Sequence, residues 1–282
     1  MASVAFLGTG LLGGAMVEGM LRRGDSVTVW NRTESKARAL EAFGAKVAAT
    51  PADAVAGAER IHMTLPDDDV VEQIVEAFRP QLGKEAIVID HTTAAPRATK
   101  VRVERLNAAG VKYLHAPVFM SPQMARDSIG IMLASGPQAI YDSVLDALEA
   151  MTGEVWYLGE RGDLAASYKI FGNSMLFVIA AGVTDVFAMA KGLGISAADA
   201  LTVFTKFQPA GVIKARGEKM ARRDFTATFE LAMARKDMRL MLEAAAGQPM
   251  TVLPSIAKAM DEAIANGHGK DDLGSIAAAV VA

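Results

Sequence analysis

The sequence predicts an α/β fold, in which a doubly wound parallel sheet is followed by an all-α C-terminal domain. Short β-branched runs alternate with segments of helical period from residue 1 to about residue 160. A glycine-rich segment follows the first of these runs and opens the first helical segment. After about residue 162 the alternation stops, and Ala, Met, Leu, Lys and Glu dominate. We therefore expect two domains, at residues 1–162 and 163–282.

The N-terminal domain is expected to contain eight strands, each rich in β-branched and aromatic residues and bounded by turn-forming residues. The expected strands cover residues 3–8, 26–31, 45–49, 60–65, 86–90, 112–118, 130–136 and 154–159. The expected helices cover residues 15–23, 36–43, 69–79, 96–109 and 139–151, and many of them are closed by Gly. This order of elements is typical of a parallel sheet covered by helices.

The C-terminal domain is expected to be helical, with helices at residues 163–193, 197–205, 210–220, 228–246 and 251–266. Apolar residues at 170–179 cover every side of the first helix, which predicts that it is buried rather than amphipathic. Its longest apolar run, residues 175–183, is shorter than the roughly 20 residues that span a bilayer and is closed by Asp185. We therefore expect no transmembrane segment and no membrane partner.

Composition narrows the possible functions. The net charge of −3 arises from 29 basic and 32 acidic residues scattered along the chain, without a basic block that would neutralise a row of phosphates. A nucleic-acid partner is therefore not expected. The chain contains no Cys, which excludes disulfides and thiolate metal sites. Its N-terminus lacks the basic start and the apolar run of at least about 7 residues of a secretory signal, so we expect a cytoplasmic protein.

No metal site is expected. The four histidines fall at strand ends or in a terminal loop without metal-ligand spacing, and we interpret them as structural: His62, His91, His115 and His268. Three consecutive aspartates at residues 67–69 are acidic enough to suggest a metal ligand, but they directly precede an expected helix. Carboxylates there cap the helix and interact favourably with its N-terminal dipole, so capping is the preferred interpretation.

The glycine-rich segment, VAFLGTGLLGGAM, has the spacing of a dinucleotide-binding motif. Gly8 allows the tight turn, Gly10 lets the backbone approach a pyrophosphate, and Gly13 permits close packing of the helix on the strand. The free N–H groups at the helix start would then face the phosphates. With a strand before it and a helix after it, the segment predicts a Rossmann-type cofactor site rather than an ordinary glycine-rich loop. The residues assigned to it are Gly8, Thr9, Gly10, Leu11, Leu12 and Gly13.

The end of the second strand, VWNRTESK, indicates which dinucleotide binds. An NAD site usually has an acidic residue here for the ribose 2′-hydroxyl, whereas an NADP site supplies cations for the 2′-phosphate. Asn31 stands where the acid would be. Arg32 and Lys36 supply positive charge, and Thr33 offers a hydroxyl. These residues predict NADP as the cofactor, with a solvated, mildly basic helix start as the alternative.

A single lysine stands in the most apolar stretch of the chain. Lys169 and Asn173 are four residues apart, so they share one face of the helix that begins near residue 163. Burial disfavours the charged form of a lysine and lowers its pKa toward the range in which it exchanges protons. The alternative is a lysine near the helix start that reaches solvent. The residues alone do not separate these two interpretations.

Several segments occur in an order that resembles the β-hydroxyacid dehydrogenase family over nearly the whole chain. They are FLGTGLLGGAM, MTLPDDDVVEQIV, VIDHTT, APV, LGERGDLAASYKIFGN and ELAMARKDMRLMLEAA. The family includes 3-hydroxyisobutyrate dehydrogenases, tartronate semialdehyde reductases, and NADPH-dependent glyoxylate and succinic semialdehyde reductases. Its most specific element is a G-x-x-G…K-x-x-x-N signature, which is satisfied here by Gly159, Gly162, Lys169 and Asn173.

The resemblance implies roles for individual residues in the chemistry and in cofactor binding. The lysine matching Lys169 donates a proton when a carbonyl is reduced and accepts one when an alcohol is oxidised. The residue matching Asn173 positions the substrate. Leu65 and Pro66 match the loop that passes the cofactor, and Thr93 matches a threonine near the nicotinamide ribose. A plain strand end is the alternative for residues 65–66.

The resemblance also assigns residues from the helical domain to the site. Lys236 and Asp237 match a Lys-Asp pair that closes the site, with Lys236 assigned to the cofactor and Asp237 to the substrate. A solvated helix face is the alternative for this pair. Phe229 matches an aromatic residue that borders the substrate in glyoxylate reductase-like members. The helical domain is therefore expected to serve both substrate binding and dimerisation.

The chain departs from the family directly after the APV segment. Members normally have Ser-Gly-Gly there, which cradles a substrate carboxylate, whereas this chain has Phe119, Met120 and Ser121. A ring and a thioether replace small groups, and the hydroxyl is displaced by two positions. We expect these residues to border the substrate, with the carboxylate preference of the family weakened and hydride transfer kept.

Together these features predict an NADP(H)-dependent oxidoreductase that interconverts a small carbonyl compound, of the semialdehyde or 2-oxo acid class, and its hydroxy acid or alcohol. Because one domain cannot cover so apolar a helix, we also expect a homodimer, as is usual in the family. An imine reductase of the same architecture is one alternative, although such enzymes generally carry an acid or tyrosine in place of Lys169. A non-catalytic NADP-binding scaffold is the other, and the presence of Lys169 disfavours it.

Overall fold

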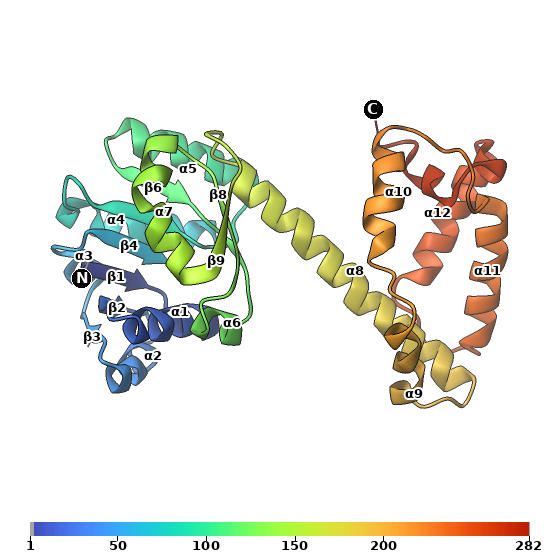
Figure 1. Cartoon of the computed structure of the whole chain (residues 1–282), viewed down its shortest axis with the longest axis horizontal. Coiled ribbons are helices and arrows are strands. Elements are labelled where there is room, and N and C mark those ends of the chain that lie inside the picture. Colours follow the sequence, from blue (N-terminus) through green and yellow to red (C-terminus); the bar gives the residue numbers. More distant parts are fainter. Residues whose placement is uncertain (1–2, 282) are drawn as a thin grey trace. The chain divides into compact units, whose positions relative to one another are not determined.

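The computed structural model describes residues 3–281 and contains two compact units, Met1–Asn173 and Ser174–Ala282. Figure 1 shows that one long helix, α8 (Leu164–Gly192), runs from the first unit into the second. The sequence placed the domain boundary before this helix, between residues 162 and 163. The compact units divide inside the helix, because its first turns contact strand β7 (Val118–Phe119) of the first unit.

The first unit is built on a six-stranded parallel sheet with the strand order β3-β2-β1-β4-β5-β6. Its strands are β1 (Ser3–Leu7), β2 (Ser26–Trp30), β3 (Lys46–Val47), β4 (Arg60–Met63), β5 (Ile87–Asp90) and β6 (Lys112–His115). The connecting helices are α1 (Leu11–Arg22), α2 (Glu34–Arg38), α3 (Pro51–Val55), α4 (Asp68–Phe78) and α5 (Pro96–Ala108). The strand order reverses between β1 and β4, so a ligand crevice is expected at the carboxyl ends of these two strands.

Both faces of this sheet are buried, which explains why its central strand β1 is apolar from Val4 to Leu7. Val4 and Phe6 of β1 belong to one apolar cluster, and Ala5 and Leu7 belong to a second. Because successive side chains of a strand point to opposite faces, the two clusters lie on opposite faces of the sheet. The four side chains are at most 1% exposed. The predicted doubly wound sheet is therefore confirmed.

A smaller sheet completes the first unit, with the strand order β7-β8-β9. Strand β7 pairs antiparallel with β8 (Gly130–Ala134), which pairs in parallel with β9 (Gly153–Tyr157). Helices α6 (Pro122–Arg126) and α7 (Gln138–Thr152) connect these strands. The single strand expected at residues 112–118 is split, because Pro117 has no N–H group to continue the ladder of β6. The split places Phe119 in the second sheet.

The second unit is helical, as predicted. Besides the end of α8, it contains α9 (Ala197–Leu201), α10 (Gly211–Ala221), α11 (Leu231–Ala244) and α12 (Leu253–Ala265). Its apolar core joins α11 to α12 through Leu231, Met238 and Met260. The carboxylate of Asp185 on α8 accepts hydrogen bonds from the N–H groups of Val252 (2.9 Å) and Leu253 (2.8 Å) at the start of α12. Short 3₁₀ helices lie at Ala39–Phe43, Arg79–Gln81, Thr202–Thr205, His268–Lys270 and Leu273–Ala277.

The prediction that helix α8 is buried is wrong for the single chain. Phe171, Phe177 and Ile179 are 62%, 72% and 53% exposed. A helix that is apolar on every side needs a covering surface on every side, and one chain does not supply it. By length and composition alone, α8 is also able to cross a membrane, and it is the one helix with this property between residues 3 and 281. The run considered in the sequence, residues 175–183, is only part of this helix.

Candidate active site

The glycine-rich turn after β1 adopts the geometry that the motif predicts. Gly8 has a φ of +94°, and a Cβ atom added to it would lie 2.2 Å from the carbonyl oxygen of Thr64. A Cβ atom on Gly13 would lie 2.1 Å from the carbonyl oxygen of Gly8, which in turn accepts a hydrogen bond of 2.6 Å from Thr64 Oγ1. A Cβ atom on Gly10 would meet no atom within 4 Å. Gly8 and Gly13 therefore allow close packing, and Gly10 leaves the backbone open to a ligand.

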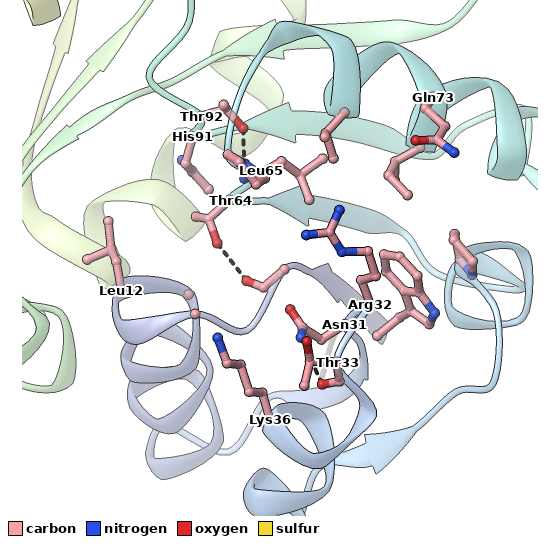
Figure 2. Close-up of a pocket in the computed structure, with 18 of the residues that line it drawn as sticks. Leu12, Asn31, Arg32, Thr33, Lys36, Thr64, Leu65, Gln73, His91 and Thr92 are labelled. Carbon is pink, nitrogen blue, oxygen red and sulfur yellow. Dashed lines mark hydrogen bonds between the residues drawn. The ribbon is translucent and has the colours of Figure 1, made fainter.

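A cavity of about 720 Å³ lies at the carboxyl ends of the strands, as expected at the point where the strand order reverses. Most residues assigned to the cofactor line it, and Figure 2 shows several of them around the opening. They are Gly8, Gly10, Leu11, Leu12, Gly13, Asn31, Arg32, Thr33, Lys36, Leu65, Pro66 and Thr93. This volume is within the usual range of small-molecule and cofactor sites.

The side chain of Asn31 ties the glycine turn to the end of β2. Its Oδ1 atom accepts a hydrogen bond of 3.0 Å from the N–H of Thr9, and its Nδ2 atom donates one of 2.9 Å to the carbonyl of Thr33. Figure 2 shows the Arg32 and Lys36 side chains pointing toward the cavity. With the neutral Asn31 between them, this edge of the cavity carries cations and no carboxylate of its own, which suits a phosphate group.

Three cavity residues that the sequence did not assign to the cofactor follow strands β4 and β5: Thr64, Thr92, and His91, which was interpreted as structural. The hydroxyl oxygen of Thr92 accepts a hydrogen bond of 3.0 Å from the N–H of Leu65, which fixes the loop after β4 to the loop after β5. Gln73 of α4 also lines the cavity. Thr64, His91 and Thr92 directly follow strands of a parallel sheet, and this position could have identified them from the sequence.

A buried polar network supports the loop after β5. Asp90 accepts hydrogen bonds from the Tyr113 hydroxyl (2.5 Å) and the Thr92 N–H (2.9 Å), and it lies 3.7 Å from Arg102 Nη1. The side chains of Asp90 and Arg102 are both 0% exposed. Although burial alone would raise the pKa of Asp90, the interactions with His115, Thr92 and Tyr113 lower it to about 2. The carboxylate is therefore ionised and holds Thr92 in place.

Two of the histidines form a hydrogen-bonded chain rather than a metal site. His91 Nδ1 lies 2.6 Å from the carbonyl oxygen of Ala116, and His91 Nε2 lies 2.9 Å from His62 Nδ1. Because a carbonyl only accepts, Nδ1 of His91 carries the proton, and Nε2 of the neutral ring accepts from His62. Burial lowers the pKa of His91 to about 4, which keeps the ring neutral at pH 7. The hydrogen bonds of these two imidazole rings join β4, the end of β5 and the segment leading to β7.

The remaining histidines and the acidic run also have structural partners. His115 is buried beside Asp90, and His268 Nδ1 lies 2.7 Å from Asp271 in the second unit. Asp67 is the N-cap of α4, where its carboxylate accepts a hydrogen bond of 2.9 Å from the Val70 N–H, so the predicted capping role is confirmed. Among residues 3–281, no group of three or more His, Asp or Glu side chains is placed to hold a metal ion.

Lys169 is half-buried on the first part of α8, where β7 holds its amino group. Its Nζ atom donates a hydrogen bond of 2.7 Å to the carbonyl of Val118 and lies 4.1 Å from the centroid of the Phe119 ring. Burial lowers the pKa of Lys169 below its ordinary value. Asn173, also half-buried, lies one turn further along the same helix. The predicted pair is therefore present, and the lysine bonds a carbonyl instead of extending freely into solvent.

The three residues that depart from the family pattern have different surroundings. Phe119 contacts Lys169 and Gly172 of α8. Met120, in contrast, packs against the apolar core of the large sheet. Ser121 is the N-cap of α6, where its hydroxyl oxygen accepts a hydrogen bond of 3.2 Å from the Met124 N–H. The three side chains therefore do not share one wall, and the expectation that they border the substrate stays a prediction.

The residues assigned from the helical domain lie in the second unit. Lys236 and Asp237 are on α11 and form an ion pair with each other, with 2.6 Å between Nζ and Oδ1. Phe229 lies just before α11, is 38% exposed, and its N–H donates to the carboxylate of Asp272. Asp272 also accepts from Arg216 Nε at 2.8 Å, so it anchors the segment that carries Phe229.

Two family models match the chain, one in each half. The model of the NAD binding domain of 6-phosphogluconate dehydrogenase matches residues 3–159. The NAD-binding model of NADP-dependent 3-hydroxyisobutyrate dehydrogenase matches residues 164–280. Both descriptions support the binding of a nicotinamide cofactor by this chain.

Curated relatives of two kinds are similar to the chain. Glyoxylate/succinic semialdehyde reductase 1 of Arabidopsis thaliana is 30% identical, over 92% of this chain and 90% of that protein. The cytokine-like nuclear factor N-PAC of Xenopus tropicalis is 28% identical over 85% of this chain but only 45% of that protein. The chain spans about half the length of the N-PAC relatives it matches.

Solved structures of reductases share the fold. The reductive aminase from Aspergillus terreus, in complex with NADPH and ethyl levulinate, has a TM-score of 0.90 at 25% identity and covers 99% of both chains. The imine reductase from Myxococcus stipitatus, in complex with NADP+, has a TM-score of 0.90 at 21% identity, over 98% of this chain and 99% of that chain. The predicted combination of a Rossmann-type domain and a helical domain is thus confirmed.

Proposed function

Because this chain belongs to the β-hydroxyacid dehydrogenase family, we propose that it is an NADP(H)-dependent oxidoreductase that interconverts a small carbonyl compound and its alcohol or hydroxy acid. One observation carries the proposal. Lys169 is half-buried and bonded to the Val118 carbonyl in the same compact unit that holds a cavity of cofactor size. A proton donor and a hydride carrier are the two components that carbonyl reduction needs.

The preference for NADP over NAD is proposed from the residues at the end of β2. Arg32 and Lys36 line the cavity and bring two cations to the place where a 2′-phosphate is recognised in such folds. Asn31 supplies no negative charge, and its amide is engaged by Thr9 and Thr33. Thr33 adds a hydroxyl at the same edge. NADPH is therefore the cofactor that this edge of the cavity suits best.

The chemistry assigned to this chain is proton transfer by Lys169. When bound, the nicotinamide supplies a hydride to the carbonyl carbon or accepts one from the alcohol carbon. In the reduction, the Lys169 ammonium gives one proton to the carbonyl oxygen and becomes a neutral amine, which regains a proton from solvent. The lowered pKa that results from burial makes this ammonium a stronger acid. Asn173, one turn further on the same helix, is proposed to hydrogen-bond the substrate oxygen.

Lys169→Ala tests the proposal. We expect kcat for carbonyl reduction to fall roughly a hundredfold or more, the size of a general-acid contribution, while the dissociation constant of NADPH changes little. In the wild type, kcat/KM for reduction should fall as the pH rises through the lowered pKa of Lys169, because only the protonated form donates. Lys191→Ala, in the last turn of the same helix, is the matched control. Near-normal turnover by Lys169→Ala would favour a non-catalytic scaffold.

Imine reduction is the second candidate function, and the Phe119 ring favours it. The ring presents an apolar surface next to Lys169, and the reductive aminase of the same fold is 25% identical. Lys169 itself favours the carbonyl reaction, since an alkoxide needs a proton where an iminium does not. Consumption of NADPH with a panel of aldehydes, 2-oxo acids and cyclic imines distinguishes the two. Faster turnover of cyclic imines than of every carbonyl compound would replace the first proposal by the second.

A cytoplasmic homodimer is proposed as the working form, with small molecules as its substrates. The homodimer is supported by the exposed apolar surface of α8, where Phe171, Leu176, Phe177 and Ile179 are 53–72% exposed. Monomeric soluble proteins rarely leave such a continuous apolar surface open. Light scattering of the purified protein tests the proposal. A monodisperse monomer, or a protein that requires detergent or vesicles to stay dispersed, would contradict it, the latter because α8 is long and apolar enough to enter a bilayer.

A further inference from the structure

Strand β7 and helix α8 meet at a contact between an aromatic ring and a glycine. A Cβ atom added to Gly172 would lie 2.4 Å from Cζ and 2.7 Å from Cε1 of Phe119. These separations are far below van der Waals contact, so the ring fills the volume that a side chain at position 172 would need. Pairing with Ile131 of β8 fixes the backbone of Phe119. The ring and the bare helix backbone therefore fit together only as a pair.

The same ring faces the amino group of Lys169. The Nζ atom is 4.1 Å from the ring centroid, within the range of a cation–π interaction. It also donates a hydrogen bond of 2.7 Å to the carbonyl of Val118, the residue before Phe119. An ammonium has three N–H bonds, and the Val118 carbonyl accepts one of them, so the amino group keeps the capacity to donate to a substrate oxygen.

We propose that Phe119 and Gly172 form a matched positioning pair, which directs the Lys169 amino group toward the substrate and selects carbonyl compounds without a charged group beside the ring. The inference rests on the proposed function, because it concerns the direction in which Lys169 delivers its proton. The faces of an aromatic ring carry the negative part of its quadrupole, so they attract an ammonium and repel a carboxylate. A carboxylate placed there would also lose hydration without gaining equivalent hydrogen bonds.

The variant Gly172→Ala tests the pair without removing a polar group. The new methyl group displaces the ring, and we expect kcat for carbonyl reduction to fall roughly tenfold or more, since small misplacements in a site have effects of this size or larger. The dissociation constant of NADPH should stay within about twofold of the wild-type value. Gly182→Ala on the same helix is the matched control, because a Cβ atom there meets nothing within 4 Å. It brings the same gain in helix propensity and should leave kcat unchanged.

Phe119→Leu provides a second test of the pair, because leucine lacks the ring atoms that would contact the new methyl group at position 172. In the Phe119→Leu background, Gly172→Ala should lower kcat by less than about twofold, compared with tenfold in the wild-type background. Phe119→Leu alone should lower kcat and raise the solvent deuterium isotope effect on kcat, because the lysine then delivers its proton from a less defined position. Thermal unfolding of all variants separates this effect from a loss of packing.

Equal costs of Gly172→Ala in the two backgrounds, or an unchanged solvent isotope effect in Phe119→Leu, would overturn the inference. Should Gly172→Ala fold poorly by itself, recovery of folding and activity in the double variant supports the pair, and no recovery contradicts it. Lys169→Ala distinguishes a failure of the proposed function from a failure of the inference about Phe119 and Gly172. If that variant retains turnover, the proposed function fails, whereas a hundredfold loss without coupling between positions 119 and 172 contradicts only the pair.

Discussion

The cofactor cavity and the lysine corner, defined here as Val118, Phe119, Lys169 and Gly172, are built differently within the same compact unit. The cavity is lined by short segments directly after β1, β2, β4 and β5, where a parallel sheet gathers the ends of its strands. The lysine corner joins residues 51 positions apart. Cofactor binding therefore follows from topology, while the setting of the lysine depends on one contact between the small sheet and α8.

The largest expected effect is on the stability that the buried charges behind the cavity give to the folded protein. Asp90→Asn removes a buried charge and one of the two carboxylate oxygens that accept from Tyr113 and Thr92. Arg102 keeps its ion pairs with Asp68 and Glu72, so the cost arises mainly from the loss of a charged acceptor in a buried place. We expect the free energy of unfolding to fall by about 3 kcal/mol. Urea denaturation measures this change. Asp261→Asn, which removes a solvent-exposed partner of Arg235, is the control and should leave the urea midpoint nearly unchanged.

The same carboxylate predicts how stability depends on pH. The folded pKa of Asp90 is about 2, below the ordinary value of 3.8, so its contribution is complete above about pH 4. It is lost as the pH falls toward 2, because protonation then removes the charge that the network stabilises. The unfolding free energy of the wild type should therefore decline over this interval, and the decline should be shallower in Asp90→Asn. Equal slopes in the two proteins would show that Asp90 is not the group responsible.

The fold followed from the sequence wherever a local pattern determined the structure. The strands of the large sheet lie within the predicted ranges, because their apolar runs end at turn residues. Helices α3 and α6 were missed, since each has only five residues and too short a period to recognise. The sequence shows that α8 is apolar on every side but not which surface covers it, and in the single chain much of the helix is exposed.

In the site, too, the sequence predicted residues that lie close to a recognisable motif but not contacts between residues far apart in the sequence. Glycine spacing and the strand-end residues predicted the lining of the cavity, since each lies within a few residues of a strand. Sequence spacing and the family resemblance marked Lys169 but not its hydrogen bond to Val118 or its contact with Phe119. Phe119 and Met120 were both assigned to the substrate, yet Phe119 contacts α8 while Met120 packs, partly buried, against the apolar core, and the sequence does not show which way each side chain faces.

A smaller effect is expected at the phosphate edge of the cavity. Arg32→Ala removes a cation from the proposed 2′-phosphate site, and a charge-assisted hydrogen bond contributes about 1.5–3 kcal/mol. The preference for NADPH over NADH, measured as the ratio of kcat/KM values, should therefore fall roughly tenfold or more. Arg38→Ala on the outer part of α2, where the arginine pairs with Glu34, is the matched control and should keep the ratio. Equal kcat/KM values for both cofactors in the wild type would contradict the proposed preference.

The smallest expected effect concerns the order of substrates at the lysine corner. With the Phe119 ring beside Lys169, a carbonyl compound with an apolar tail should be reduced with a higher kcat/KM than glyoxylate, because the tail gains about 25 cal/mol per Å² of buried apolar area. Phe119→Ser should narrow this ratio a few-fold or reverse it by restoring a hydroxyl and open space. Met120→Leu is the control, since that side chain packs in the core and a volume-conserving change there should leave the ratio as it is. If the wild type already favours glyoxylate, another group, such as the Ser121 hydroxyl, holds the carboxylate, and the ring does not set the order.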